Sequence, residues 1–163
     1  MDKTRERALA RTIVRRTAKN MEPFGYALTK PTFICKEFPQ LIGFFHFHKF
    51  SFAPSFQLHF GIRLLNSDFP APHLNGPSFH NLPDYSEDDE SVRNCVQKLT
   101  ELLINEGLSW VEDWVAPEKL ISDNRSPLSE HDKAGLKRAV EIGADPKRVA
   151  LSYRLLGIKK RAD

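Results

Sequence analysis

The chain has 163 residues, 40% of them hydrophobic and 28% charged, with a formal net charge of +3. These values are ordinary for a globular protein, and the length is enough for one domain to bury a core. The mild charge does not by itself imply a nucleic-acid partner, and neither a secretory segment nor a long apolar run indicates export or a membrane span. The two cysteines, Cys35 and Cys95, lie far apart without metal-type spacing, so we expect a cytoplasmic protein with reduced thiols.

Residues 3–20 are predicted to form an amphipathic helix, because their apolar side chains recur at helical spacing on one side. The remaining positions are rich in arginine, and three of these follow each other at intervals of four: Arg7, Arg11 and Arg15. We interpret this basic side as a solvated helix face. The alternative is a surface for an acidic partner or for the phosphate backbone of a nucleic acid.

Two runs of alternating residues, 42–50 and 55–64, predict a β-hairpin. The four residues between them pair Phe50 with Ser55, and this pairing sets the register of both strands. The expected cross-strand pairs are Phe45 with Phe60, Phe47 with Leu58, His46 with His59, and His48 with Gln57. One side of the hairpin is therefore apolar, and the other carries opposed histidines.

A preceding strand at residues 32–38 joins the hairpin through a tight turn containing Pro39. This arrangement places Ile34 beside Phe45 and completes a three-stranded antiparallel meander. Residues 66–90 form a long non-periodic segment, in which a further short strand is expected around residues 77–81. The acidic cluster at its end suits the N-terminus of the following helix.

The clearest helix is predicted at residues 91–106, with Gly107 as its stop signal. Ser109 then begins a short helix carrying Trp110 and Trp114, both of which we expect to pack on the sheet.

Two more helices are expected at residues 128–142 and 146–156, which together would form a C-terminal helical hairpin. The basic tail Lys159–Arg161 is expected to be frayed. The predicted fold class is α+β: an antiparallel β-meander of three to five strands packed against helices, with the C-terminal helical hairpin. Residues 1–115 would form the core domain, and residues 116–163 would be a helical extension packed on the same domain.

The side of the sheet opposite the apolar ladder is the candidate binding surface. Its residues are Phe33, Phe44, His46, His48, Gln57, His59 and Arg63. A mixed aromatic and cationic strip of this kind is typical of a binding surface if it is exposed. The alternative is that residues 66–90 or a helix cover it. If it is open, the opposition of His46 and His59 would make binding sensitive to pH near the histidine pKa of about 6.5.

A metal site is the second interpretation of the histidines. His46 and His48 are alternate strand residues with His59 opposite, and three histidines could bind zinc or another divalent metal ion in an open catalytic site. Half-buried histidines satisfied by hydrogen bonds are the interpretation that we favour. No catalytic motif is present, so we predict no catalytic residues and expect a protein that is not an enzyme.

Several segments carry a resemblance to a known family. They are Phe24-Gly25-Tyr26 after the first helix, Phe33 in a strand, the hairpin of residues 45–51, the strand Leu58-His59-Phe60-Gly61-Ile62, and Leu108-Ser109-Trp110. Over roughly residues 5–115 this pattern resembles the bacterial group known as domain of unknown function 4304. Some members lie beside polymorphic toxins and are regarded as immunity proteins. The resemblance implies no catalytic residue.

We therefore expect a non-enzymatic cytoplasmic binding protein, of the immunity type, which binds another protein through the aromatic and histidine-bearing sheet face. The alternatives are a metal-dependent enzyme that uses His46, His48 and His59, and a nucleic-acid-binding protein that uses the basic first helix.

Overall fold

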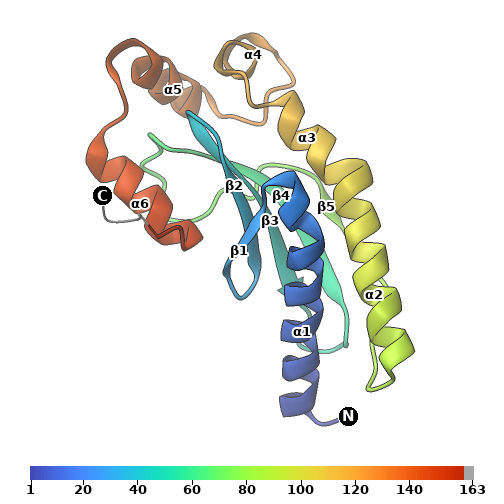
Figure 1. The fold of residues 1–163 in the computed structure, drawn as a ribbon. Coiled ribbons are helices and arrows are strands. Elements are labelled where there is room, and N and C mark those ends of the chain that lie inside the picture. Colours follow the sequence, from blue (N-terminus) through green and yellow to red (C-terminus); the bar gives the residue numbers. More distant parts are fainter. Residues whose placement is uncertain (160–163) are drawn as a thin grey trace.

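The computed structural model describes residues 1–159, so the expectation for the tail beyond Lys159 lies outside the described residues. A five-stranded antiparallel sheet occupies the centre, and its strands lie side by side in chain order (Figure 1). The strands are β1 (Ala27–Lys30), β2 (Phe33–Glu37), β3 (Leu41–Lys49), β4 (Phe56–Leu64) and β5 (Ser78–Phe79). The predicted α+β class and antiparallel meander are confirmed.

Two long helices, α1 (Lys3–Met21) and α2 (Asp89–Leu102), pack together against one face of the sheet. The remaining helices are α3 (Leu108–Asp113), α4 (Pro117–Ser122), α5 (Glu130–Ile142) and α6 (Pro146–Leu156). Figure 1 shows α3, α4 and α5 at one end of the sheet and α6 on the side away from α1 and α2.

The register of the hairpin is the predicted one. Phe45 pairs with Phe60 and His46 pairs with His59, while the Phe50 amide donates to the Ser55 carbonyl at 3.1 Å across the loop. Ile34 also lies beside Phe45, as expected. The short strand β5 falls within the range predicted for it. The edge strand β1 was not predicted, because its four residues, two exposed and two half-buried, lack an alternating apolar pattern.

The main core lies between the sheet and the pair of long helices. The rings of Phe45 and Phe60 meet edge to face with centroids 5.1 Å apart, and aromatic pairs in this geometry add stability beyond the apolar area that they bury. Ile13 of α1 and Leu99 of α2 are fully buried in the same cluster. The apolar stripes of both helices therefore have the role that their spacing predicts.

The prediction that a helix ends at Gly107 is wrong, and so is the prediction that a new helix begins at Ser109. The backbone continues from α2 through a π-helical turn, Leu103–Gly107, directly into α3. A Cβ atom on Gly107 would lie 2.8 Å from a ring carbon of Phe45. Glycine is needed here because the helix crosses the sheet closely. Trp110 contacts Phe60, and Trp114 is buried with the sheet residues at this end, as predicted.

The two C-terminal helices are confirmed as consecutive elements, but each packs on a different surface. α5 contacts α4 and buries Leu136 beside Leu64 at the end of the sheet. α6 buries Leu156 against Ile42 on the second sheet face. The short helix α4, which was not predicted, buries Leu120 in the same cluster as Leu136.

The two helical glycines provide a matched test of this packing. Gly107→Ala is expected to lower the free energy of unfolding by about 1–3 kcal/mol, because the added methyl group overpacks Phe45. Gly135→Ala in α5 is the control. Its Cβ would have no neighbour closer than 4.0 Å, and alanine in a helix is favoured over glycine by up to about 1 kcal/mol. Urea denaturation of both variants measures the difference, and an equally stable Gly107→Ala variant would contradict the close approach.

Candidate functional site

The second face of the sheet is divided into a covered half and an open half. α6 covers Phe44, which is fully buried with Cys35, Ile42 and Leu156. Arg63 is 0% exposed beneath the same helix. The prediction that Phe44 and Arg63 belong to an exposed binding surface is therefore wrong, because the side chains of α6 occupy that space.

The open half carries the other predicted residues, which we call the histidine strip: Phe33, His46, His48, Gln57 and His59. His48 is exposed and the other four are half-buried. The rings of Phe33 and His46 have centroids 4.5 Å apart, and His46 stacks on His59 at 6.0 Å. Five side chains that share one sheet face are thus brought into a continuous row, as the alternation predicted.

An aromatic pair at the hairpin tip extends this strip. The ring of Phe50 lies 5.9 Å from that of His48 and 5.0 Å from that of Phe52, onto which it stacks. Phe52 is 80% exposed, which is unusual for so large an apolar side chain. Sequence periodicity missed Phe52 because the residue lies in the loop, where alternation no longer assigns a face.

The environment of His46 disfavours its charged form. Burial, together with smaller effects of the neighbouring His59 and His48, lowers the pKa of His46 to about 4. The pKa of His59 is also lowered, mainly by burial. The Nδ1 atom of His46 is buried and has no hydrogen-bond partner among the described residues. At neutral pH the strip therefore presents the neutral imidazole ring of His46.

The predicted metal site has no further support from the geometry. Within residues 1–159, no group of three or more His, Cys, Asp or Glu side chains is placed to hold a metal ion. His46 and His59 lie with their rings stacked, and His48 contacts the ring of Phe50.

Neither cysteine is a candidate nucleophile. Burial raises the pKa of both Cys35 and Cys95 to about 12, which keeps these thiols protonated and weakly nucleophilic.

The basic side of α1 forms one wall of two adjoining grooves. A groove of about 230 Å³ is lined by Arg7 and Arg11, with Val14 and Phe47 among its apolar residues. The next groove, of about 280 Å³, is lined by Arg11 and Arg15. All three arginines are exposed, and none forms an ion pair with another residue of the described chain.

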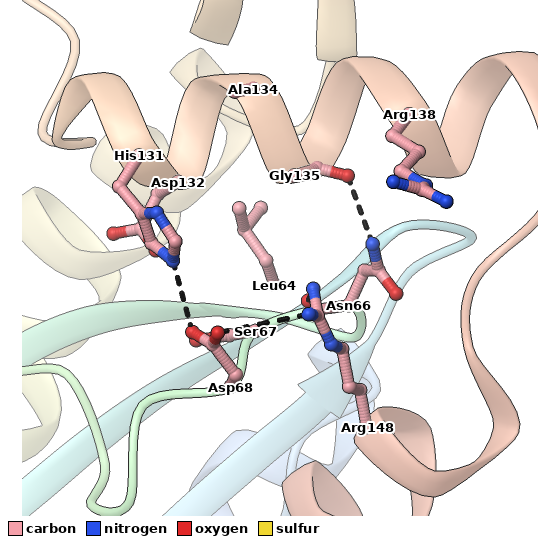
Figure 2. Close-up of a pocket in the computed structure, with 10 residues that line it drawn as sticks. All are labelled: Leu64, Asn66, Ser67, Asp68, His131, Asp132, Ala134, Gly135, Arg138 and Arg148. Atoms are coloured by element: carbon pink, nitrogen blue, oxygen red, sulfur yellow. Dashed lines mark hydrogen bonds and ion pairs between the residues drawn. The ribbon is translucent and has the colours of Figure 1, made fainter.

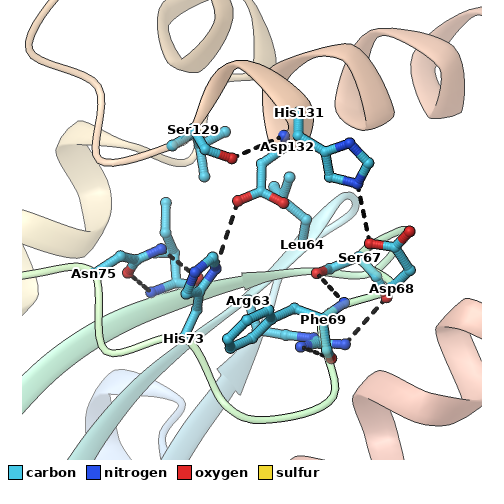
Figure 3. Close-up of polar contacts among 12 residues, drawn as sticks. Arg63, Leu64, Ser67, Asp68, Phe69, His73, Asn75, Ser129, His131 and Asp132 are labelled. Atoms are coloured by element: carbon cyan, nitrogen blue, oxygen red, sulfur yellow. Dashed lines mark hydrogen bonds and ion pairs between the residues drawn. The ribbon is translucent and has the colours of Figure 1, made fainter.

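Beneath α6, Arg63 connects β4 to two distant segments (Figure 3). Its Nε donates to the Ser152 hydroxyl of α6 at 2.9 Å, and Nη1 donates to the Phe69 and Ala71 carbonyls at 2.8 and 2.9 Å. Nη2 donates to the Ser67 carbonyl at 3.1 Å. Burial lowers the pKa of Arg63, whereas nearby Asp132 and Asp68 raise it, and a guanidinium retains its charge in a protein. This network fixes α6 to the sheet.

A polar pocket of about 300 Å³ lies between α5, the start of α6 and the segment after β4 (Figure 2). Asp68 accepts a hydrogen bond from His131 at 3.1 Å, and its other oxygen lies 3.7 Å from a guanidinium nitrogen of Arg148. Asp132 also lines the pocket, and its Oδ2 lies 3.5 Å from Nδ1 of His73. Sequence reasoning missed this pocket, because three segments far apart in the chain supply its residues.

The lowered pKa of His46 predicts an acid-labile contribution to stability. In the unfolded chain the imidazole has its ordinary pKa of 6.5, so unfolding takes up a proton between that value and about 4. His46 should therefore not lower the free energy of unfolding above pH 6.5. As the pH falls from 6.5 toward 4, protonation of His46 in the unfolded chain should lower the free energy of unfolding. His46→Phe should show a shallower decline over this window in urea denaturation, and an unchanged slope would contradict the assignment.

No helix in the described part of the chain is long and apolar enough to cross a membrane. No family model matches the chain, no curated protein is similar to it, and no solved structure matches its fold.

Proposed function

We propose that this chain is a non-enzymatic binding protein whose histidine strip and hairpin tip bind another protein. The observation that carries the proposal is that Phe52 is 80% exposed and stacks on Phe50, whose ring in turn lies against that of His48. A protruding aromatic side chain next to a row of further aromatic rings is typical of the anchor of a protein interface.

The composition of the strip also supports a protein partner. Aromatic residues are enriched in the centre of interfaces, and charged residues are depleted there. The histidine strip contains one phenylalanine, three histidines and one glutamine, without a carboxylate or a lysine. His46, which burial keeps neutral at neutral pH, is removed from water at a lower free-energy cost than a charged side chain would be.

The resemblance to bacterial immunity-type proteins suggests the kind of partner. An immunity protein binds a toxin and blocks it, and it needs no catalytic residue for this purpose. We propose that the partner of this chain is a toxin protein in the cytoplasm. The product of an adjacent gene is the first candidate to be tested.

A second candidate function is nucleic-acid binding through α1. The favouring observation is the row of Arg7, Arg11 and Arg15, which are exposed and free of ion pairs within the described chain. A spacing of four residues places them along one side of the helix, where successive guanidinium groups can contact successive phosphates.

The double substitution Phe52→Asp with His48→Asp tests the first proposal. Both side chains are exposed, so the fold should be retained. The partner captured by the wild-type chain should bind the double variant at least about tenfold more weakly, because loss of an interface anchor removes about 2 kcal/mol or more. Affinity purification from the source cells followed by calorimetric titration of the captured protein measures this effect.

Val140→Asp is the matched control, because Val140 is also exposed but lies on α5 away from the strip. It should bind the partner as the wild type does. Equal binding by the wild type, the double variant and the control would refute the proposed surface.

Alanine at Arg7, Arg11 and Arg15 tests the second candidate. Binding of labelled duplex DNA or RNA, followed by fluorescence anisotropy, should weaken and become less dependent on salt. Each phosphate contact that is lost lowers the slope of log K against log salt concentration by about 0.9 on B-DNA.

The control removes the same number of positive charges elsewhere, by alanine substitution of Arg93, Lys137 and Arg154. If this variant and the α1 variant lose affinity equally, then general charge attraction and not the α1 row accounts for binding. Absence of binding by the wild type would exclude this function.

A further inference from the structure

The pocket beneath α5 continues into a second one, and together they form a cleft that the proposed protein-binding surface does not use. The two cavities, of about 300 and about 270 Å³, share Asn66, Arg138 and Arg148 as walls. The first alone reaches the lower end of the range of about 300–1,000 Å³ that is usual for small-molecule sites. We call the combined space the α5–α6 cleft.

The walls of the cleft are held in place before any ligand arrives. The buried Asn66 amide donates to the Gly135 carbonyl of α5 at 3.0 Å and accepts from the Asp145 amide, the N-cap of α6, at 2.8 Å. Ser152 of α6 donates to the Leu64 carbonyl and receives the Arg63 hydrogen bond. The two helices and the floor of the cleft are therefore connected by buried hydrogen bonds, which limits the ordering that binding requires.

One end of the cleft carries two arginines, beside the N-cap residue Asp145 of α6. Arg138 has no ion pair or hydrogen bond from its side chain to any residue from 1 to 159. Arg148 makes only long contacts, 3.4 Å to the Asn66 carbonyl and 3.7 Å to Asp68. Figure 2 shows these two side chains reaching into the same space from α5 and α6. The two guanidinium groups have unused donors and lie on opposite walls. They suit a carboxylate or a phosphate, because each guanidinium can bind such a group with a pair of hydrogen bonds.

The other end is acidic. Asp132 is only 6% exposed, and its Oδ2 has no hydrogen bond from any described residue. This Oδ2 lies 3.5 Å from Nδ1 of the His73 imidazole, and Figure 3 shows the pair. Asp68 stands beside it and is shared between His131 and Arg148. A carboxylate in the wall of the cleft favours a ligand that brings a hydrogen-bond donor or a positive charge.

From this separation of charge we infer that the α5–α6 cleft binds a small zwitterion of amino-acid size. Its carboxylate lies between Arg138 and Arg148, its protonated amine faces Asp132 and Asp68, and its carbon chain lies over Leu64 and Ala134. The lining of the combined cleft carries three carboxylates, Asp68, Asp132 and Asp145, and two guanidinium groups, so groups of both signs face the cavity. A dipolar ligand matches such a lining better than a simple anion or a simple cation does.

The test uses the full-length protein and a panel of the twenty common amino acids, each with its N-acetylated form, together with orthophosphate. Binding is measured by thermal shift and then by calorimetric titration. At least one free amino acid should bind, and acetylation of its amine should weaken binding by about tenfold or more, since it removes the charge that faces Asp132.

Arg138→Ala should weaken binding of that amino acid by about tenfold or more without loss of stability, because Arg138 is exposed and without a partner in the described chain. Lys137→Ala, one residue away on the same helix, should leave binding unchanged and is the matched control. Asp132→Asn adds a second measurement at the acidic end, where a conservative change should also weaken binding of the free amino acid.

Two outcomes would overturn the inference. The first is that no amino acid in the panel binds. The second is that orthophosphate or the acetylated compounds bind as tightly as the free amino acid, which would show an anion site only. Because the protein-binding variants Phe52→Asp and His48→Asp lie on the far side of α6, they should leave amino-acid binding intact, so each proposal can fail without the other.

Discussion

The pairing of Phe45 with Phe60 across β3 and β4 is the constraint on which the rest of the structure depends. Side chains of a strand alternate between faces, so a shift of one residue would exchange the core ladder for the histidine row. In the observed register the two rings meet in the core, and His46 meets His59 on the other face. Gly61 then faces the ring of Phe44, where a Cβ would lie only 2.3 Å from a ring carbon.

The burial of Arg63 follows from the same alternation and decides how much of the second face is covered. Removing a guanidinium from water is unfavourable unless its donors are satisfied. Its acceptors come from residues 67–71 on one side and from Ser152 of α6 on the other. α6 must therefore stay over this part of the sheet, and its removal would leave a buried charge without one of its hydrogen bonds.

Local rules predicted the elements whose stability depends on nearby residues. The four-residue loop at 51–54 determined the register, and α6 has the bounds predicted for it, Pro146–Leu156. The same rules failed at Gly107, because a glycine needed for close packing looks the same in sequence as a glycine that ends a helix.

The candidate sites show a similar limit. Alternation assigned Phe44 and Arg63 to the correct face, but it contains no information on which distant helix covers that face. The α5–α6 cleft was beyond prediction for the same reason, since Asn66, Arg138 and Arg148 meet only through long-range packing. Asp132 was equally inconspicuous as one acidic residue among many in the sequence.

The boundary between the covered and the open half has a physical cause that also restricts what can bind there. α6 ends at Gly157, whose left-handed backbone lies so close to β1 that a Cβ would approach the Thr29 carbonyl oxygen to 2.6 Å. Beyond that point the face presents His46, with a buried Nδ1 that lacks a partner in the described chain. Because that atom is already out of reach of solvent, a partner cannot satisfy it and meets only the half-buried ring, whose charged form is disfavoured. A partner that binds the strip tightly therefore has to combine a recess for Phe52 with a surface that fits a neutral imidazole ring without an opposing charge.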